Sequence, residues 1–175
     1  MKTLRFLLLD ANIVIELHRL QLWDTFVRRC EVLLPSTVVE LEAKFFHGRD
    51  SDEQIDLTPH VEQDLVKQVQ ADAAEVQAFL KRFTPDYLGA MDPGESELLT
   101  YLTLSDDPCL ACSSDAIVFR ILGRLNLGEQ GRSLEELLRT LGLSQSLTWQ
   151  FSEKFRIQWT KRGEQEMIRG IGMRP

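Results

Sequence analysis

Four acidic side chains are the candidates for chemistry in this sequence, because each comes just after a predicted strand or near the start of a predicted helix: Asp10, Glu40, Glu95 and Asp115. Carboxylates that converge without a base repel one another and raise each other's pKa values. A cluster of them is therefore stable chiefly around a divalent cation. Ligands that are all oxygen atoms suit Mg²⁺ or Mn²⁺. The pattern predicts a metal centre built from these four carboxylates.

Each acid also has a purely structural interpretation. Asp is a preferred N-cap residue, so Asp10 and Asp115 could each cap the helix that follows. Glu40 could be a solvated helical residue. The capping interpretation explains an acid at the end of a strand, but it does not explain Glu residues on two helices directed at the same edge of a sheet.

Glu95 and Glu97 compete for one position, because residues two apart on a helix point to nearly opposite sides. Leu98, Leu99 and Leu102 define the predicted buried face of this helix, and Glu95 precedes the first two by three and four residues. We therefore expect Glu95 to face the site and Glu97 to point toward solvent. Glu97 is the substitute if Glu95 does not take this role.

Short apolar segments alternate with helical patterns along the chain and must position these acids. The predicted strands span residues 4–9, 32–34 and 109–112, and their lack of polar alternation suits strands buried on both faces. The predicted helices span residues 12–28, 38–48, 61–83, 94–102, 117–125 and 133–141, and the polar segment 49–59 is a surface loop or a short edge piece. This alternation predicts an α/β domain with a mainly parallel sheet, which binds ligands beyond the carboxyl ends of its strands.

Length and composition favour one domain in a cytoplasmic protein. The chain has 175 residues with 43% hydrophobic content, enough for one core, and Asp10 cuts the first apolar segment too short for a signal peptide or a membrane span. Three cysteines do not indicate a disulfide framework. The net charge of -7 argues against a general nucleic-acid coat protein, whereas the tail from Ser152 carries six basic and three acidic residues and is the candidate for phosphate contact.

Several strings resemble PIN domains over residues 4–127. LLLDANIVIEL is similar to the opening of that family, in which an Asp ends the first strand. STVVELE resembles the second acidic motif and places the matching acid at Glu40 and not at Glu42. PGESELLTYL and ACSSDAIVFRILGRL are similar to the third and fourth motifs of a branch with a Gly-Glu-x-Glu helix start.

The resemblance implies a three-layer α/β/α nuclease domain over residues 1–142 with a basic, aromatic helical extension at 143–175. PIN domains are mostly Mg²⁺- or Mn²⁺-dependent endoribonucleases, which include the toxins of VapC-type toxin–antitoxin pairs. It implies RNA hydrolysis by metal-activated water, an antitoxin partner and a homodimer. In these roles Asp10 and Asp115 are direct ligands, Glu40 and Glu95 complete the shell or hold its waters, and Asn12, Ser113 and Ser114 orient carboxylates or phosphate oxygens. The long segment 49–92 and the tail after Gly142 depart from the compact toxins.

The remaining sequence features are weaker indications of function. Cys109 and Cys112 have the spacing of half a zinc knuckle, but the sequence has no second pair. The three histidines share no spacing, and no strand is followed by a Gly-rich phosphate loop. Phe151, Phe155 and Trp159 form a stripe that packs on the domain or on a second subunit; the alternative is RNA stacking or antitoxin binding.

Two other functions compete with the nuclease. The first is a PIN-like module that binds RNA or a partner protein without cleaving. The second is phosphoryl transfer with Asp10 as a covalent nucleophile. That chemistry expects a second Asp at the position of Asn12 and a Lys near a strand end, and the sequence has neither.

Overall fold

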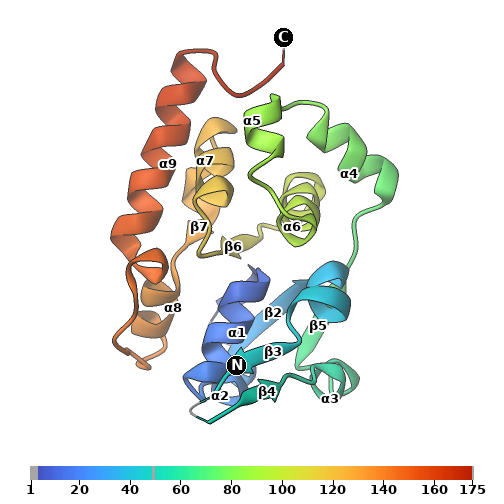
Figure 1. Cartoon of the computed structure of the whole chain (residues 1–175), viewed down its shortest axis with the longest axis vertical. Coiled ribbons are helices and arrows are strands. Elements are labelled where there is room, and N and C mark those ends of the chain that lie inside the picture. The colour runs from blue at the N-terminus through green and yellow to red at the C-terminus, as the bar shows by residue number, and fades with distance from the viewer. Residues whose placement is uncertain (1–3, 49, 175) are drawn as a thin grey trace.

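Parallel strands form the centre of the fold. The structure, a computed structural model, describes residues 4–48 and 50–174 and has five strands in the order β5-β2-β1-β6-β7, with every described pairing parallel (Figure 1). The sheet consists of β1 (Leu4–Leu9), β2 (Cys30–Pro35), β5 (Val66–Val69), β6 (Leu110–Cys112) and β7 (Gly131–Arg132). A separate antiparallel pair is formed by β3 (Phe45–His47) and β4 (Asp52–Gln54).

Helices cover both faces of this sheet, which explains why its central strands β1 and β2 are mainly apolar. Leu7 and Leu9 pack into one core, and Leu8, between them, packs into the other. The helices are α1 (Ala11–Arg19), α2 (Trp23–Arg29), η1 (Val38–Glu42), α3 (Thr58–Glu62), α4 (Ala73–Leu80), α5 (Pro85–Leu88), α6 (Pro93–Leu104), α7 (Ala116–Arg124), η2 (Gly128–Gln130), α8 (Leu134–Thr140), η3 (Trp149–Phe151) and α9 (Glu153–Ile168). The predicted three-layer α/β fold with a parallel sheet is confirmed. Over the described residues, no helix has the length and apolar character needed to cross a membrane.

The segment 12–28 contains two helices, so the prediction of one continuous helix is wrong. Gln21, with φ of 57°, takes the left-handed conformation between α1 and α2, and the Leu22 N–H bonds back to the Leu17 carbonyl at 2.9 Å. A residue in this conformation ends a helix. The apolar spacing continued across the break because both helices bury their apolar sides in the same core.

The prediction of one long helix over 61–83 is also wrong, because residues 66–69 of this stretch form β5. Helix α3 ends at Glu62, Asp64 reverses the chain with φ of 54°, and Val66–Val69 then pairs with β2 as an edge strand. Lys67 and Gln68 of β5 are exposed. Pairing with β2 outweighs the helical spacing of the valines and leucines in this stretch.

The helix predicted over 38–48 ends early. Only the wide π-helical turn η1 forms, after which β3 pairs with β4. The polar segment 49–59 therefore contains a strand, β4, which confirms the prediction of a short edge piece over that of a surface loop. Arg49, at the start of this segment, lies outside the described residues.

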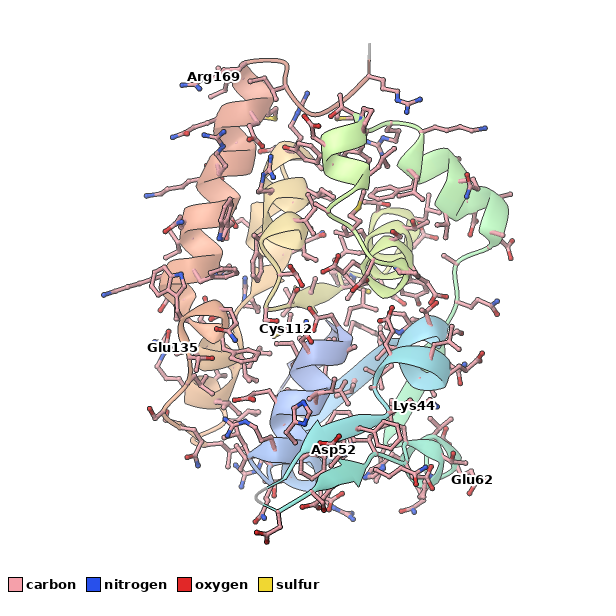
Figure 2. All side chains as sticks on the ribbon, viewed as in Figure 1. Lys44, Asp52, Glu62, Cys112, Glu135 and Arg169 are labelled. Carbon is pink, nitrogen blue, oxygen red and sulfur yellow. The ribbon has the colours of Figure 1, made fainter. Side chains whose placement is uncertain are left out.

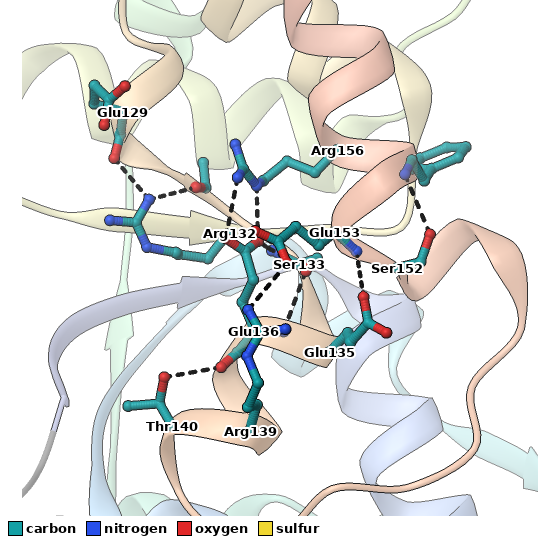
Figure 3. A network of polar contacts seen from close by, with 12 residues as sticks. Glu129, Arg132, Ser133, Glu135, Glu136, Arg139, Thr140, Ser152, Glu153 and Arg156 are labelled. Carbon is teal, nitrogen blue, oxygen red and sulfur yellow. Dashed lines mark hydrogen bonds and ion pairs between the residues drawn. The ribbon is translucent and has the colours of Figure 1, made fainter.

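The C-terminal extension packs on the domain through α9. Gly123 of α7 and Gly163 of α9 allow the two helices to touch backbone to backbone, because a Cβ added at Gly163 would lie 2.0 Å from the Arg120 carbonyl oxygen. Phe155 is buried against Phe119. Polar contacts between α8 and α9 add to this packing, including the Arg156–Glu136 ion pair at 2.7 Å (Figure 3). The aromatic stripe thus packs partly into the domain core.

Candidate active site

The carboxyl ends of β1 and β6 form the site. These strands are neighbours in the sheet, while β2 lies beyond β1 and β7 beyond β6. Such a point, at which the chain connections diverge to opposite sides, is where parallel α/β sheets open a crevice for ligands. The Asp10 N–H donates to the Cys112 carbonyl at 3.2 Å and ties the two strand ends together. Figure 2 shows Cys112 at the centre of the molecule, beside the start of α1.

Asp10 is held by three bonds that use both of its oxygens. Oδ1 accepts the N–H of Ile13 at 2.9 Å and so caps α1, as the structural interpretation predicted. Oδ2 accepts the Ser113 hydroxyl and the Ser114 N–H, the latter at 3.3 Å. The side chain is buried, with 4% of the residue exposed, and burial raises the pKa of Asp10 to about 7 although these bonds lower it.

Glu95 is fixed by a reciprocal capping box. Its carboxylate accepts the Asp92 N–H at 3.0 Å, and its own N–H donates to Asp92 Oδ1 at 2.8 Å. Burial raises the pKa of Glu95 well above its usual range, and the nearby carboxylates of Asp115 and Asp92 raise it further. The Asp115 carboxyl group therefore lies close to that of Glu95 and favours the protonated form of Glu95.

Asp115 stands at the N-cap position of α7 but its side chain makes no capping bond. Its N–H instead donates to the Ser113 hydroxyl oxygen at 2.9 Å. The capping interpretation of Asp115 is therefore wrong, because its carboxyl group makes no capping bond and lies close to that of Glu95. Ser113, fully buried, contacts both Asp10 and the Asp115 backbone and takes the orienting position expected of it.

Glu42, and not Glu40, reaches the acid pocket, a cavity of about 250 Å³ that is lined by Asp10, Ala11, Asn12, Ile15, Glu42, Asp92 and Glu95. Glu42 accepts the Gly94 N–H at 3.0 Å, and burial followed by the charge of Asp92 raises its pKa. Glu40 bonds the Gln68 amide at 2.8 Å and lines a different cavity. The predicted position of Glu40 in the site is wrong.

The π-helical turn η1 is the physical reason that Glu42, and not Glu40, lies at the acid pocket. The Ala43 N–H donates to the Val38 carbonyl five residues back, at 3.0 Å, so η1 is wider than an α-helix and each residue turns through a smaller angle. The side chain directed at the pocket is then Glu42. No α-helical pattern in STVVELE indicates this.

Glu97 differs from expectation, and Asn12 does not orient the Asp10 carboxylate, whereas its expected role toward phosphate oxygens stays a prediction. Glu97 does not point to solvent: it is 6% exposed and accepts the N–H groups of Thr37 at 2.9 Å and Ala71 at 3.4 Å, which ties α6 to the chain after β2 and β5. Asn12 is exposed at the lip of the acid pocket, and the bonds that Asp10 makes within the described residues come from other groups.

Sequence reasoning missed Glu42 and Asp92. Asp92 had a usable signal, because Asp-Pro-Gly-Glu at 92–95 has a capping residue three positions before an acid and predicts a capping box. Such a box brings the Asp92 side chain to the same helix start as Glu95. Glu42 had no comparable signal.

The carboxyl oxygens of the candidate site suit a hard divalent cation. In the described residues, however, these carboxyl groups do not converge on one point. Two carboxyl groups, Asp10 and Glu95, are buried with raised pKa values, and the partners recorded for them in the described chain include no Lys or Arg. Within residues 4–48 and 50–174, no three His, Cys, Asp or Glu side chains are arranged to hold a metal ion together. If Glu95 and Asp115 are to bind an ion together with Asp10, Glu95 must lose its proton and the side chains must turn toward one point.

Comparisons with protein-family models, with curated proteins and with solved structures find no match to this chain. The similarity to PIN domains therefore rests on the sequence motifs, with a fold of the expected class around them.

Proposed function

We propose that this chain is a Mg²⁺- or Mn²⁺-dependent endoribonuclease that hydrolyses RNA phosphodiester bonds at the acid pocket. The observation that carries the proposal is the burial of Asp10 and Glu95, with raised pKa values, at the crevice between β1 and β6. Buried carboxyl groups with perturbed pKa values at such a crevice are typical of functional sites. The family resemblance contributes the choice of RNA as substrate.

The chain's own residues have distinct roles in this mechanism. Ser113 fixes the Oδ2 atom of Asp10, and Asp115, free of any capping bond, can turn toward the same ion. Asp10 and Asp115 would hold the divalent cation, which would supply a bound water molecule of lowered pKa and offset charge on the phosphate. Glu42 and Glu95 lie within reach to hold waters, and Asn12 at the exposed lip is placed to donate to a phosphate oxygen.

A second function, RNA or protein binding without cleavage, is favoured by one specific observation. Asp10 and Glu95 both make helix-capping bonds, so each would remain useful to the fold without a metal. The cytoplasmic location, the antitoxin partner and the homodimer belong to the proposal only as expectations from the sequence and the family resemblance.

The substitution Asp10→Asn separates these functions. Asn keeps the capping oxygen and the size of the side chain, so the variant should lose less than about 1 kcal/mol of stability. If Asp10 binds the ion, Mn²⁺-dependent RNA cleavage should fall by roughly two orders of magnitude or more. Asp86→Asn, on the exposed side of α5, is the matched control and should cleave like the parent. Cleavage by Asp10→Asn at the parent's rate in saturating Mn²⁺ would remove the basis of the proposal.

A further inference from the structure

A second, larger cavity of about 800 Å³ adjoins the acid pocket. It lies between η1, α4 and the first turn of α6, and Asp92 lines both cavities. Figure 1 shows α4 and α6 next to each other, with the chain from β5 running up to α4 along the same side. A ligand that reaches the acid pocket can therefore extend into this cavity without leaving the protein surface.

The lining combines an apolar surface with amide groups. The half-buried side chains of Leu80, Leu88 and Met91 form the apolar part and pack against the core under α6. Gln70 and Gln77 lie at the exposed rim, and each carries an amide that can both donate and accept. An apolar surface edged by such groups suits a nucleobase, whose ring faces are apolar and whose edge carries donors and acceptors.

Charge changes sign along the cavity. The end nearest the acid pocket carries Asp92, whereas the far end carries Lys81 and Arg174. Lys81 is exposed, and Arg174 is held in place by its Nε–H bond to the Phe83 carbonyl at 3.0 Å. The two cations therefore provide a positive end that can receive a phosphate.

The two Glu residues in the lining lie at the η1 side of the cavity and not beside Lys81 and Arg174. Glu97 is held by the N–H groups of Thr37 and Ala71, and Glu40 by the amide of Gln68. These donors are neutral, so both carboxylates keep their negative charge, but the bonds hold them beside η1 and β5. The far end keeps its positive charge.

We propose that this cavity binds one unstacked nucleoside of single-stranded RNA next to the phosphate that is cleaved, with the neighbouring phosphate held by Lys81 and Arg174. The inference rests on the proposed function, because the cleaved phosphate is assigned to the acid pocket. The volume lies within the roughly 300–1,000 Å³ typical of small-ligand sites. RNA is favoured over an apolar peptide segment because the apolar surface is bounded by charge at both ends.

Binding of a short, fluorescently labelled single-stranded RNA, measured in EDTA so that cleavage does not consume it, tests the proposal. Lys81→Glu should weaken binding at least about tenfold and make its dependence on salt shallower by about one unit of the logarithmic slope. The matched control is Arg28→Glu, at an exposed residue of α2 outside the cavity and outside the basic tail, which changes the net charge equally. Gln77→Leu should change the order in which poly(A), poly(C) and poly(U) compete, without unfolding the chain.

The outcomes separate this inference from the proposed function. Equal losses in Lys81→Glu and Arg28→Glu, or the absence of RNA binding, overturn the nucleoside site. Displacement of bound RNA by a neutral apolar peptide but not by nucleoside monophosphates also overturns it. If RNA binding depends on Lys81 but the parent chain cleaves no RNA in Mn²⁺, the nucleoside site stands and the nuclease proposal fails.

Discussion

The Ser113 hydroxyl donates to Oδ2 of Asp10 and so joins the ends of β6 and β1 at the candidate active site. The same hydroxyl oxygen accepts the N–H of Asp115 at 2.9 Å. One buried side chain therefore sets the position of two of the proposed metal ligands. Its partner Ser114 contacts Asp10 only through the backbone N–H.

Ser113→Ala should lower Mn²⁺-dependent cleavage by roughly one to two orders of magnitude, because residues that orient a metal ligand typically contribute that much. The substitution also removes a bond that lowers the pKa of Asp10, so the activity profile should move to higher pH. Steady-state cleavage measured over a pH series tests both effects. Ser114→Ala keeps the backbone bond and should behave like the parent. A similar loss in both variants would show that the Ser113 hydroxyl has no special role.

Glu42→Gln and Glu40→Gln form a matched pair on η1. Glu42→Gln keeps the oxygen that accepts the Gly94 N–H but removes a negative charge from the acid pocket, so we expect Mn²⁺ affinity to fall about tenfold. Glu40 points away from the pocket toward Gln68, and its substitution should leave Mn²⁺ affinity unchanged. Calorimetric titration with Mn²⁺ measures both. The opposite ranking would return the second acidic role to Glu40.

The acids that could be predicted from the sequence are those set by strong local signals. Asp10 follows an apolar strand and Glu95 lies in a capping box, and both come to the predicted edge of the sheet. Their chemical roles stay predictions. Glu42 could not be predicted, because a π-helical turn depends on how the segment packs and not on its local spacing of apolar residues.

The same distinction holds for the fold. Strands β1 and β2 lie at the centre of the sheet and read as continuous apolar segments, whereas β5 is an edge strand with two exposed polar residues, Lys67 and Gln68. Its identity depends on pairing with β2, which is distant in the sequence. The local spacing of apolar residues gives no information about a distant partner strand, so the sequence predicts a helix over residues 61–83.

Without metal, the free energy of unfolding should fall as the pH rises from about 4 to about 7. The pKa of Asp10 is about 7 in the folded chain against an ordinary 3.8, so the folded state keeps a proton that the unfolded state has lost. The retained proton contributes on the order of a few kcal/mol to the free energy of unfolding. This stabilisation is fully present below the ordinary pKa of Asp and is lost as the pH rises through the pKa of Asp10 in the folded chain.

Urea denaturation of the parent and of Asp10→Asn in EDTA, over this pH range, isolates the contribution, because the amide does not titrate. Mn²⁺ should raise the stability of the parent most above pH 7, because the Asp10 carboxyl group has then lost the proton with which Mn²⁺ competes. Parallel curves for the two proteins, with no effect of Mn²⁺ on either, would contradict both the raised pKa and the metal site.

Gly163→Ala should destabilise the chain by roughly 1–3 kcal/mol through overpacking between α7 and α9. The added Cβ would lie 2.0 Å from the Arg120 carbonyl oxygen and 2.8 Å from the Arg124 nitrogen, and both atoms are backbone, so the helices must separate. Replacing Gly by Ala inside a helix otherwise adds up to about 1 kcal/mol of helix propensity, so a net loss measures the steric conflict.

Gly89→Ala is the control, because its Cβ would meet only the Pro85 carbonyl, at an ordinary 3.4 Å. Thermal melting of both variants gives the comparison. Since α7 begins directly after Asp115, separation of α7 from α9 should also weaken the Mn²⁺ response, which a purely peripheral tail would leave unchanged. A Gly163→Ala protein as stable as the parent would show that the close approach of the two helices is not required by the fold.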